Sequence, residues 1–185
     1  ILSHLKKSKR PAIIIGGGIR ISKTNKELLV FLKGINVPLI TTWSGVDAIT
    51  HDHKNYIGNV GVYGSRAANF VIQNSDFVLS LGSRLDTRVT GGIPKNFARN
   101  AIIASIDIDK NELNKNRGLE IKIKINESLK DFFNYFIKLS KNKIIDKPEW
   151  VEKSILWKKK YPTVLDSDRK QKKYVNPYFF MERLS

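Results

Sequence analysis

Five short apolar runs recur along the chain, and segments with helical spacing stand between them. The runs are residues 12–15, 37–41, 77–81, 101–106 and 121–125. Strands this apolar are typical of a parallel sheet that helices cover on both faces. The helical segments are residues 26–33, 65–74 and 127–140, where apolar side chains recur every three or four positions. The sequence therefore predicts an α/β fold with a doubly wound parallel sheet of about six strands.

Helix ends and polar connectors suggest how the chain divides. We expect Gly34 to act as the C-cap of the first helix and Asn126 as the N-cap of the helix over 127–140. Residues 1–140 then form one α/β domain, and residues 141–175 form a helix near 148–160 followed by an extended linker. Asn176 precedes a proline and an apolar segment, which indicates that residues 176–185 begin a further domain.

Composition excludes several classes of protein. The 185 residues include no cysteine, so disulfides and thiolate metal sites are excluded. No apolar run reaches the roughly 20 residues of a membrane helix, and no signal peptide is visible, so we expect a cytoplasmic protein without a membrane partner. The net charge of +16 is spread evenly, with about +8 in residues 1–110 and about +8 in residues 111–185. A solvated lysine-rich surface explains this better than nucleic-acid binding does.

Glycines, hydroxyls and charged side chains follow the predicted strands. In an open α/β sheet, ligands bind outside the carboxyl ends of the strands. Gly16 to Gly18 follow the first strand and could let backbone N–H groups approach a diphosphate, or could form only a tight turn. The other loops at strand ends are residues 41–45, 61–64, 82–91 and 107–109.

The charged residues of these loops leave alternatives open. Arg84 and Arg88 could bind a phosphate or carboxylate, or could pair with Asp86 between them. Of Asp107 and Asp109, one could accept hydrogen bonds from a ribose and the other could cap the next turn. No acid stands about 20 residues beyond the glycines, which disfavours a nicotinamide cofactor. No nucleophile–base pair and no metal-ligand spacing stand out, so we expect neither a catalytic residue nor a metal ligand in this chain.

Three segments together resemble the central domain of thiamine-diphosphate-dependent enzymes of the acetolactate synthase (large subunit) group. They are residues 82–91, Ser75–Asp76, and residues 106–109, and the resemblance runs over residues 10–126, with weaker similarity to the end. It implies a Rossmann-like, DHS-like NAD/FAD-binding fold that holds FAD or ADP. The implied contacts are Gly16, Gly17, Gly18, Thr42, Trp43, Ser44, Gly61, Val62, Tyr63, Gly82, Ser83, Arg84, Asp86, Arg88, Asp107 and Ile108.

The resemblance also implies a role in a larger protein. Flanking pyrimidine- and diphosphate-binding domains would hold thiamine diphosphate and Mg²⁺, and the complete enzyme would be a homodimer or homotetramer of branched-chain amino acid biosynthesis. It would decarboxylate a 2-keto acid such as pyruvate and transfer the two-carbon unit. The family's Gly-Asp-Gly motif does not occur here, so this chain alone should be inactive.

Three positions depart from the family pattern. Tyr63 stands where the family usually has histidine, Thr87 replaces the second aspartate of an Arg-x-Asp-Asp-Arg pattern, and Asn126 replaces an acid. Two alternatives from other classes are a stand-alone NAD-binding domain related to sirtuin-type deacylases, which the missing zinc cysteines disfavour, and a basic nucleic-acid-binding module.

Overall fold

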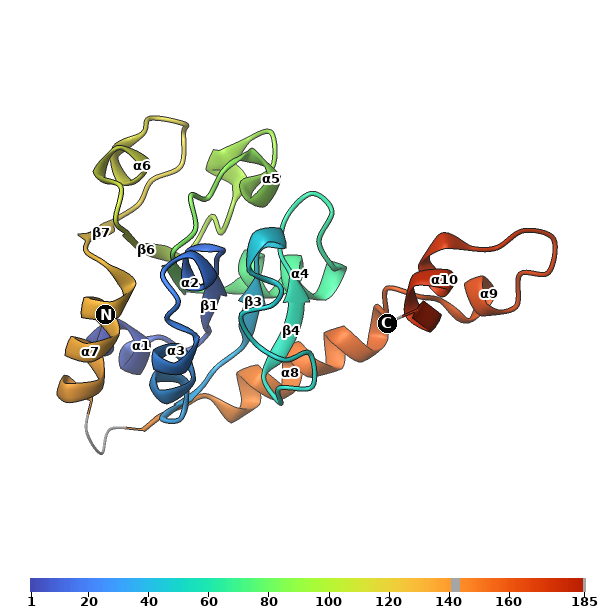
Figure 1. Cartoon of the computed structure of the whole chain (residues 1–185), viewed down its shortest axis with the longest axis horizontal. Helices are drawn as coiled ribbons and strands as arrows, with labels where there is room; N and C mark the ends of the chain where they lie inside the picture. Colours follow the sequence, from blue (N-terminus) through green and yellow to red (C-terminus); the bar gives the residue numbers. More distant parts are fainter. Residues whose placement is uncertain (141–143, 185) are drawn as a thin grey trace.

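The computed structural model describes residues 1–140 and 144–184, and its centre is a sheet of six parallel strands (Figure 1). In sheet order the strands are β4 (Tyr56–Asn59), β3 (Leu39–Thr41), β1 (Pro11–Ile15), β5 (Phe77–Leu81), β6 (Ile102–Asp107) and β7 (Ile123–Asn126). The chain starts in the middle at β1, moves outward to β3 and β4, and then returns to β5 on the other side of β1. This reversal between β1 and β5 is the switch point of a doubly wound sheet, as the sequence predicts.

Helices cover both faces of this sheet, because alternate strand residues point to opposite sides. In β1, Ile13 and Ile15 join one core, while Ala12 and Ile14 join the other, and all four are fully buried. The first face carries α1 (Leu2–Lys7), α3 (Asn25–Leu32) and α7 (Leu129–Leu139). The second carries α4 (Arg66–Asn74) and α8 (Pro148–Lys160).

The helix α8 is fixed to the sheet by one buried tryptophan. Trp150 is 4% exposed, and its indole N–H donates to the carbonyl oxygen of Pro11 at 3.0 Å. Because that carbonyl belongs to the first residue of β1, the hydrogen bond joins α8 to the start of the central strand. Beyond α8, the short helix α9 (Asp166–Arg169) and α10 (Pro177–Leu184) lie away from the sheet (Figure 1).

The remaining elements are short and belong mostly to the loops at the strand ends. They are α2 (Gly18–Ile21), η1 (Trp43–Gly45), α5 (Thr87–Thr90), η2 (Pro94–Asn96) and α6 (Lys110–Asn114). A separate two-stranded sheet pairs β2 (Ile35–Asn36) with β8 (Ile145–Asp146).

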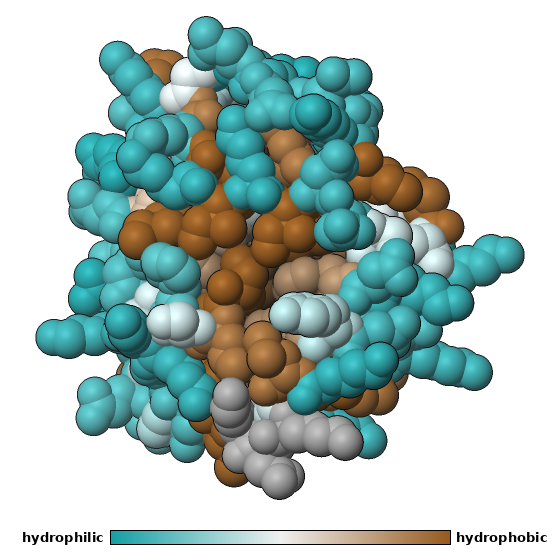
Figure 2. Space-filling model, turned by 90° about the vertical axis from the view of Figure 1, so that its left-hand side faces the viewer, coloured by the Kyte–Doolittle hydropathy of each residue, from teal (hydrophilic) through white to brown (hydrophobic). Residues whose placement is uncertain are grey.

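An apolar groove of about 200 Å³ lies between α3 and α7. Phe31 of α3 packs against Phe132, Phe133 and Phe136 of α7, with ring centroids 4.8–6.2 Å apart. Figure 2 shows this side of the molecule, where hydrophobic side chains form a continuous area between hydrophilic margins. The groove is on the helical layer, and the site described below is at the end of the sheet.

Most predicted elements are confirmed, and the differences concern one missed strand of the six-stranded sheet and the bounds of several strands and helices. The strand over 77–81 and the helix over 148–160 have the expected bounds. The strand β4 was not predicted, because it is only four residues long and contains Gly58, whose φ is +140°. The expected linker after residue 160 contains the helix α9, whose first turn is capped by the Asp168 carboxylate accepting from the N–H of Leu165.

The two predicted caps are wrong, each for a local reason. The helix α7 is capped by Ser128, whose hydroxyl oxygen accepts from the N–H of Asp131 at 3.1 Å, and not by Asn126. The helix α3 ends at Leu32 with Lys33 as its C-cap, and Gly34 does not take the left-handed conformation of a C′ glycine. The chain instead runs directly into β2, and the Gly34 carbonyl accepts from the N–H of Ile145.

Candidate functional site

All six strands are parallel, so their carboxyl ends meet at one edge of the sheet. The loops that the sequence singles out all leave from this edge: after β1 at Gly16, after β3 at Thr42, after β4 at Gly61, after β5 at Gly82 and after β6 at Ile108. The edge is the place where doubly wound sheets bind ligands. We refer to it below as the carboxyl edge.

At the centre of the carboxyl edge, glycines bring two protein backbones together. A Cβ atom at Gly16 would lie 2.2 Å from the carbonyl oxygen of Gly82, and one at Gly18 would lie 2.8 Å from the Gly82 Cα. The N–H of Gly18 donates to that same carbonyl oxygen at 3.0 Å. Gly82 itself has a φ of +59°, which a side chain would strain. These glycines are therefore required for the contact between the β1 and β5 loops.

The loop after β3 packs onto this centre in the same way. A Cβ at Gly17 would lie 2.8 Å from the Ser44 hydroxyl oxygen, and one at Gly45 would lie 2.4 Å from the carbonyl oxygen of Ile15. Thr42 is 3% exposed, and its hydroxyl lies 3.3 Å from that of Ser44. The hydroxyls expected to face a ligand thus partly satisfy each other.

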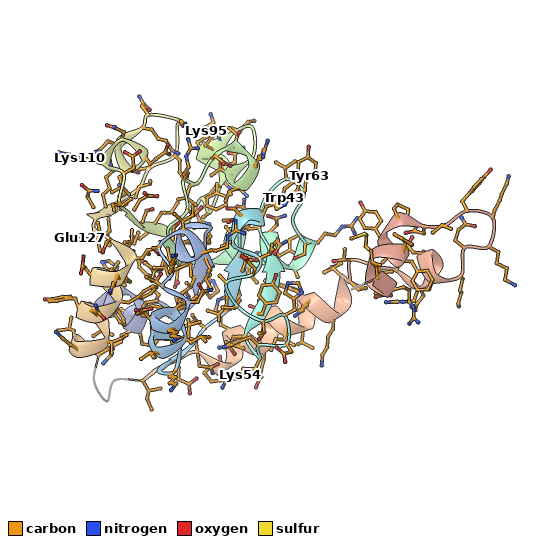
Figure 3. The ribbon with its side chains drawn as sticks, in the orientation of Figure 1. Trp43, Lys54, Tyr63, Lys95, Lys110 and Glu127 are labelled. Atoms are coloured by element: carbon orange, nitrogen blue, oxygen red, sulfur yellow. The ribbon has the colours of Figure 1, made fainter. Side chains whose placement is uncertain are left out.

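The edge opens into a pocket of about 240 Å³ beside this packed centre, which we call the aromatic pocket. It is lined by Trp43, Val46, Asn59, Val60, Tyr63, Gly64, Arg88 and Val89. Trp43 and Tyr63 are 66% and 80% exposed, and their rings meet edge to face with centroids 6.1 Å apart. Figure 3 shows them next to each other on the loops after β3 and β4, with Lys110 at the other end of the carboxyl edge.

Backbone contacts hold the walls of the aromatic pocket together. The N–H of Val62 donates to the carbonyl oxygen of Arg88 at 2.9 Å, and a Cβ at Gly61 would lie 2.3 Å from that oxygen. The Asn69 side chain clamps the same loop, because it accepts from the N–H of Gly61 and donates to the Gly61 carbonyl. Three segments expected to form a site, after β3, β4 and β5, are thus brought together here.

The Asp86 carboxylate caps the short helix that follows it and does not pair with Arg84. The carboxylate accepts from the backbone N–H groups of Arg88 and Val89, at 2.9 Å and 3.3 Å, and so caps α5. The alternative that Arg84 pairs with Asp86 is wrong, because the Arg84 guanidinium lies 2.8 Å from Glu112. Within the described residues no carboxylate pairs with Arg88, which borders the aromatic pocket.

A charged cluster of Arg84, Glu112 and Lys115 lies on the other side of the centre. The Lys115 ammonium donates to the Glu112 carboxylate and to the carbonyl oxygen of Arg84, so α6 is tied to the β5 loop. Hydrogen bonds from Lys115 and then Arg84 hold the pKa of Glu112 below its ordinary value, and Glu112 raises the pKa of Arg84 in return. Neither Glu112 nor Lys115 was predicted as a site residue.

Next to this cluster, the two acids at the end of β6 have different local roles, and the cap expected of one of them is confirmed for Asp109. Asp109 caps α6, accepting from the N–H of Asn111 at 2.8 Å, and Asp107 accepts from the N–H of Asp109 at 3.0 Å. The side chain of Asn126 donates to the carbonyl oxygens of Asp107 and Ile108, which joins β7 to this loop. Ile108 is 75% exposed and lies open to a ligand at the edge.

The predicted site residues therefore form two groups on either side of a packed centre. The aromatic group contains Trp43, Tyr63 and Arg88, with Val62 bonded to the Arg88 backbone, and the charged group contains Arg84, Asp107 and Ile108. Ser83 packs against Gly16 at the centre. Sequence reasoning missed Asn59 in the aromatic pocket, because the strand that ends there was not recognised.

Other chemistry is sparse in the part of the chain that the structure describes. No group of three or more His, Asp or Glu residues is arranged there to hold a metal ion. His4 stacks on Phe77 and His51 on Tyr56, with ring centroids 5.3 Å and 5.2 Å apart, so both histidines serve packing. None of the helices in residues 1–140 and 144–184 combines the length and the apolar character needed to cross a membrane.

Comparison with known proteins identifies the family of this chain. Residues 1–133 match the model for the central domain of thiamine pyrophosphate enzymes. The chain is 36% identical over 170 residues to a probable acetolactate synthase large subunit of Methanococcus aeolicus, which covers 87% of this chain and 28% of that protein. It is 36% identical over 182 residues to the corresponding protein of Methanocaldococcus jannaschii, covering 97% and 30%.

A bacterial relative gives the same result. The acetolactate synthase large subunit of Lactococcus lactis is 34% identical over 162 residues, covering 88% of this chain and 28% of the relative. The chain thus spans less than a third of the length of these relatives. Both the match over residues 1–133 and the identity over most of the chain show that it belongs to the central-domain family of thiamine pyrophosphate enzymes.

Proposed function

We propose that this chain is the nucleotide-binding central domain of an acetolactate synthase-like enzyme, and that FAD or ADP lies along its carboxyl edge. The observation that carries the proposal is the aromatic pocket, where Trp43 and Tyr63 stand exposed beside Arg88. Exposed aromatic rings next to a cation suit a planar ring that carries a phosphate. The relatives' names as acetolactate synthase large subunits support the choice of enzyme.

The two groups at the edge suit the two ends of such a nucleotide. The charged group offers the Asp107 carboxylate, which can accept hydrogen bonds from a ribose, and the exposed side chain of Ile108. The aromatic pocket of about 240 Å³ can take a ring system but not a whole dinucleotide, so the diphosphate would lie between the groups. Arg84 and Arg88 flank that region and can neutralise it.

In the complete protein, we propose that flanking pyrimidine- and diphosphate-binding domains bind thiamine diphosphate and Mg²⁺, and that the subunits form a homodimer or homotetramer. Thiamine diphosphate held by those domains would supply the electron-accepting chemistry that decarboxylation of a 2-keto acid needs. The substrate would be pyruvate or a similar 2-keto acid, and the two-carbon unit would pass to a second keto acid. This chain contributes the nucleotide site and the surface around it.

Calorimetric titration tests the nucleotide. FAD, ADP and NAD are titrated into the wild-type chain and into an Arg84→Ala, Arg88→Ala double variant. We expect FAD or ADP to bind more tightly than NAD, and the double variant to lose about tenfold or more in affinity, since each charge-assisted contact contributes over 1 kcal/mol.

The matched control removes the same charge elsewhere. Lys159→Ala, Lys172→Ala changes two exposed lysines outside the carboxyl edge and should leave the affinity unchanged. Tightest binding of NAD, or equal binding of FAD to the wild type and the arginine variant, would contradict the assignment.

A carbon dioxide release assay tests whether this chain alone can decarboxylate pyruvate. The chain with pyruvate, thiamine diphosphate and Mg²⁺ should release no more carbon dioxide than buffer, because its sequence has no Gly-Asp pair to begin the cofactor-binding motif. Turnover above that blank would show that thiamine diphosphate chemistry resides in this chain.

A further inference from the structure

The aromatic pocket contains one polar side chain whose orientation is fixed from behind. Asn59 is the last residue of β4, and its side-chain oxygen Oδ1 accepts two hydrogen bonds. The Thr41 hydroxyl donates one at 2.6 Å, and the Tyr56 hydroxyl donates the other at 2.8 Å. Thr41 is fully buried and Tyr56 is 6% exposed, so water does not compete for these hydroxyls.

This arrangement determines which end of the amide faces the pocket. The two hydroxyl oxygens lie 3.2 Å apart, and both are directed at Oδ1 of Asn59. Burial raises the pKa of Tyr56, so its hydroxyl keeps the proton that it donates. Asn59 lines the pocket, and within the described residues its amide nitrogen makes no hydrogen bond and is not buried, so it can donate to a ligand there. The pocket thus has a fixed donor between its aromatic and aliphatic walls.

The residues that line the pocket restrict which ligand groups can accept a hydrogen bond from Asn59. Val46, Val60 and Val89 give the pocket an apolar lining, while the rings of Trp43 and Tyr63 border it. A flat ring system with an apolar edge and a carbonyl oxygen matches a site of this kind. The flavin ring of FAD has both, whereas adenine has no carbonyl oxygen.

We propose that Asn59 is a specificity-determining residue that donates a hydrogen bond to a carbonyl oxygen of a flavin ring held in the aromatic pocket. Thr41 and Tyr56 are its positioning residues, since they act through Asn59. The inference rests on the proposed function, because it assigns the flavin end of the nucleotide to this pocket. The adenosine end then lies at the charged group, next to Asp107.

Substitution of Asn59 tests whether the aromatic pocket binds the flavin end of the nucleotide. Asn59→Leu removes the donor at similar volume and should lower the affinity for FAD by about tenfold, the loss expected for one buried hydrogen bond. Asn59→Asp places a carboxylate against the ring carbonyl and should lower it further. The affinity for ADP, which has no flavin ring, should stay within about twofold of the wild type in both variants.

Two positioning variants keep the test informative if Asn59→Leu folds poorly. Tyr56→Phe and Thr41→Val each remove one of the two hydroxyls behind Asn59, and each should weaken FAD binding by about threefold without affecting ADP. Asn100→Leu, at an exposed turn, is the matched control and should change neither affinity. Flavin fluorescence quenching and calorimetry measure binding, and circular dichroism checks the fold.

The outcomes distinguish this inference from the proposed function. FAD affinity that falls in the Asn59 variants while ADP affinity holds supports the assignment. Equal losses for both nucleotides, or unchanged FAD affinity, would overturn it while leaving nucleotide binding intact. If the wild-type chain binds neither FAD nor ADP, the proposed function itself fails, and the role of Asn59 fails with it.

Discussion

The centre of the carboxyl edge is closed, while its β3–β4 end is open, although both are built from glycine-containing loops. At the centre, Gly16 and Gly18 lie against Gly82 with no room for a single methyl group. At the open end, Gly61 and Gly64 also make close backbone contacts, but Trp43 and Tyr63 border a pocket of about 240 Å³. A glycine-rich turn at a strand end can therefore serve protein packing as well as a ligand, and the two uses can stand side by side.

The two flanks of that centre also differ in charge. On one flank, Glu112 binds Arg84 and Lys115, so a ligand phosphate must compete with an internal carboxylate. On the other flank, no carboxylate of the described residues pairs with Arg88. The more available cation is thus beside the aromatic rings.

The largest effect is expected from filling the closed centre. Gly16→Ala places a methyl group 2.2 Å from the Gly82 carbonyl oxygen, a backbone atom that cannot rotate away. We expect the free energy of unfolding, measured by urea denaturation, to fall by about 3 kcal/mol or more, at the upper end of overpacking effects.

Gly92→Ala is the control for this prediction. A Cβ at Gly92 meets no heavy atom within 4 Å, and its φ is not in the left-handed region. The substitution should leave stability unchanged or raise it by about 0.5 kcal/mol, because alanine restricts the unfolded chain. Similar effects at both glycines would mean that the centre is not packed as described.

At the open end, a truncation should affect binding and spare the fold. Trp43→Ala removes a ring that is 66% exposed, so the free energy of unfolding should change by less than about 0.5 kcal/mol. The affinity for FAD should fall by about tenfold, as expected when a stacking aromatic is lost. Tyr135→Ala removes an equally exposed ring on α7 and should not affect binding. A large loss of stability with Trp43→Ala would instead assign Trp43 a structural role.

A smaller effect is expected from the charged flank. Glu112→Gln keeps the shape of the side chain but releases Arg84 from its ion pair, so the affinity for ADP should rise by about threefold. Titration calorimetry measures this change. Glu120→Gln, whose carboxylate is exposed and pairs with Lys122, is the matched control. Weaker ADP binding in Glu112→Gln would show that the ion pair positions Arg84 for the nucleotide.

The same variant gives a pH signature. The pKa of Glu112 is lower in the folded chain than its ordinary value of 4.5, because Lys115 and Arg84 donate to the carboxylate. The stabilisation is therefore complete above about pH 4.5 and is lost as pH falls through the lower folded value. Thermal unfolding between about pH 6 and pH 3 should show a shallower loss of stability in Glu112→Gln than in the wild type.

The sequence predicts the helices and strands that follow from local patterns. It does not predict contacts between segments that are distant in the chain. The buried strand over 77–81 and the helix over 148–160 follow from apolar runs and a proline at a helix start. Asn126 and Ser128 are equally good caps by residue type. Only the folded chain shows that the Asn126 amide is used by two carbonyls of the β6 loop, which leaves Ser128 to cap α7.

The missed parts of the site have the same origin. Asn59 ends a short strand with a glycine inside it, so no apolar run marked the position. Glu112 is far from Arg84 in sequence, and its partner depends on how α6 packs beside the β5 loop. Spacing between the arginines and Asp86 suggested a local pair, but helix capping uses that carboxylate.

The smallest effect is expected from the surface ion pair that joins the closed centre to the open end. Arg20 of α2 lies 3.4 Å from Asp47, beyond η1, and the two side chains are 64% and 49% exposed. Asp47→Asn should change the free energy of unfolding by less than about 0.5 kcal/mol and the affinity for FAD by less than about twofold, because exposed pairs are screened by water and salt. Urea denaturation and titration at low and moderate salt measure both. A larger, salt-dependent loss of affinity would mean that charge, rather than glycine packing, holds the β3 loop against the centre.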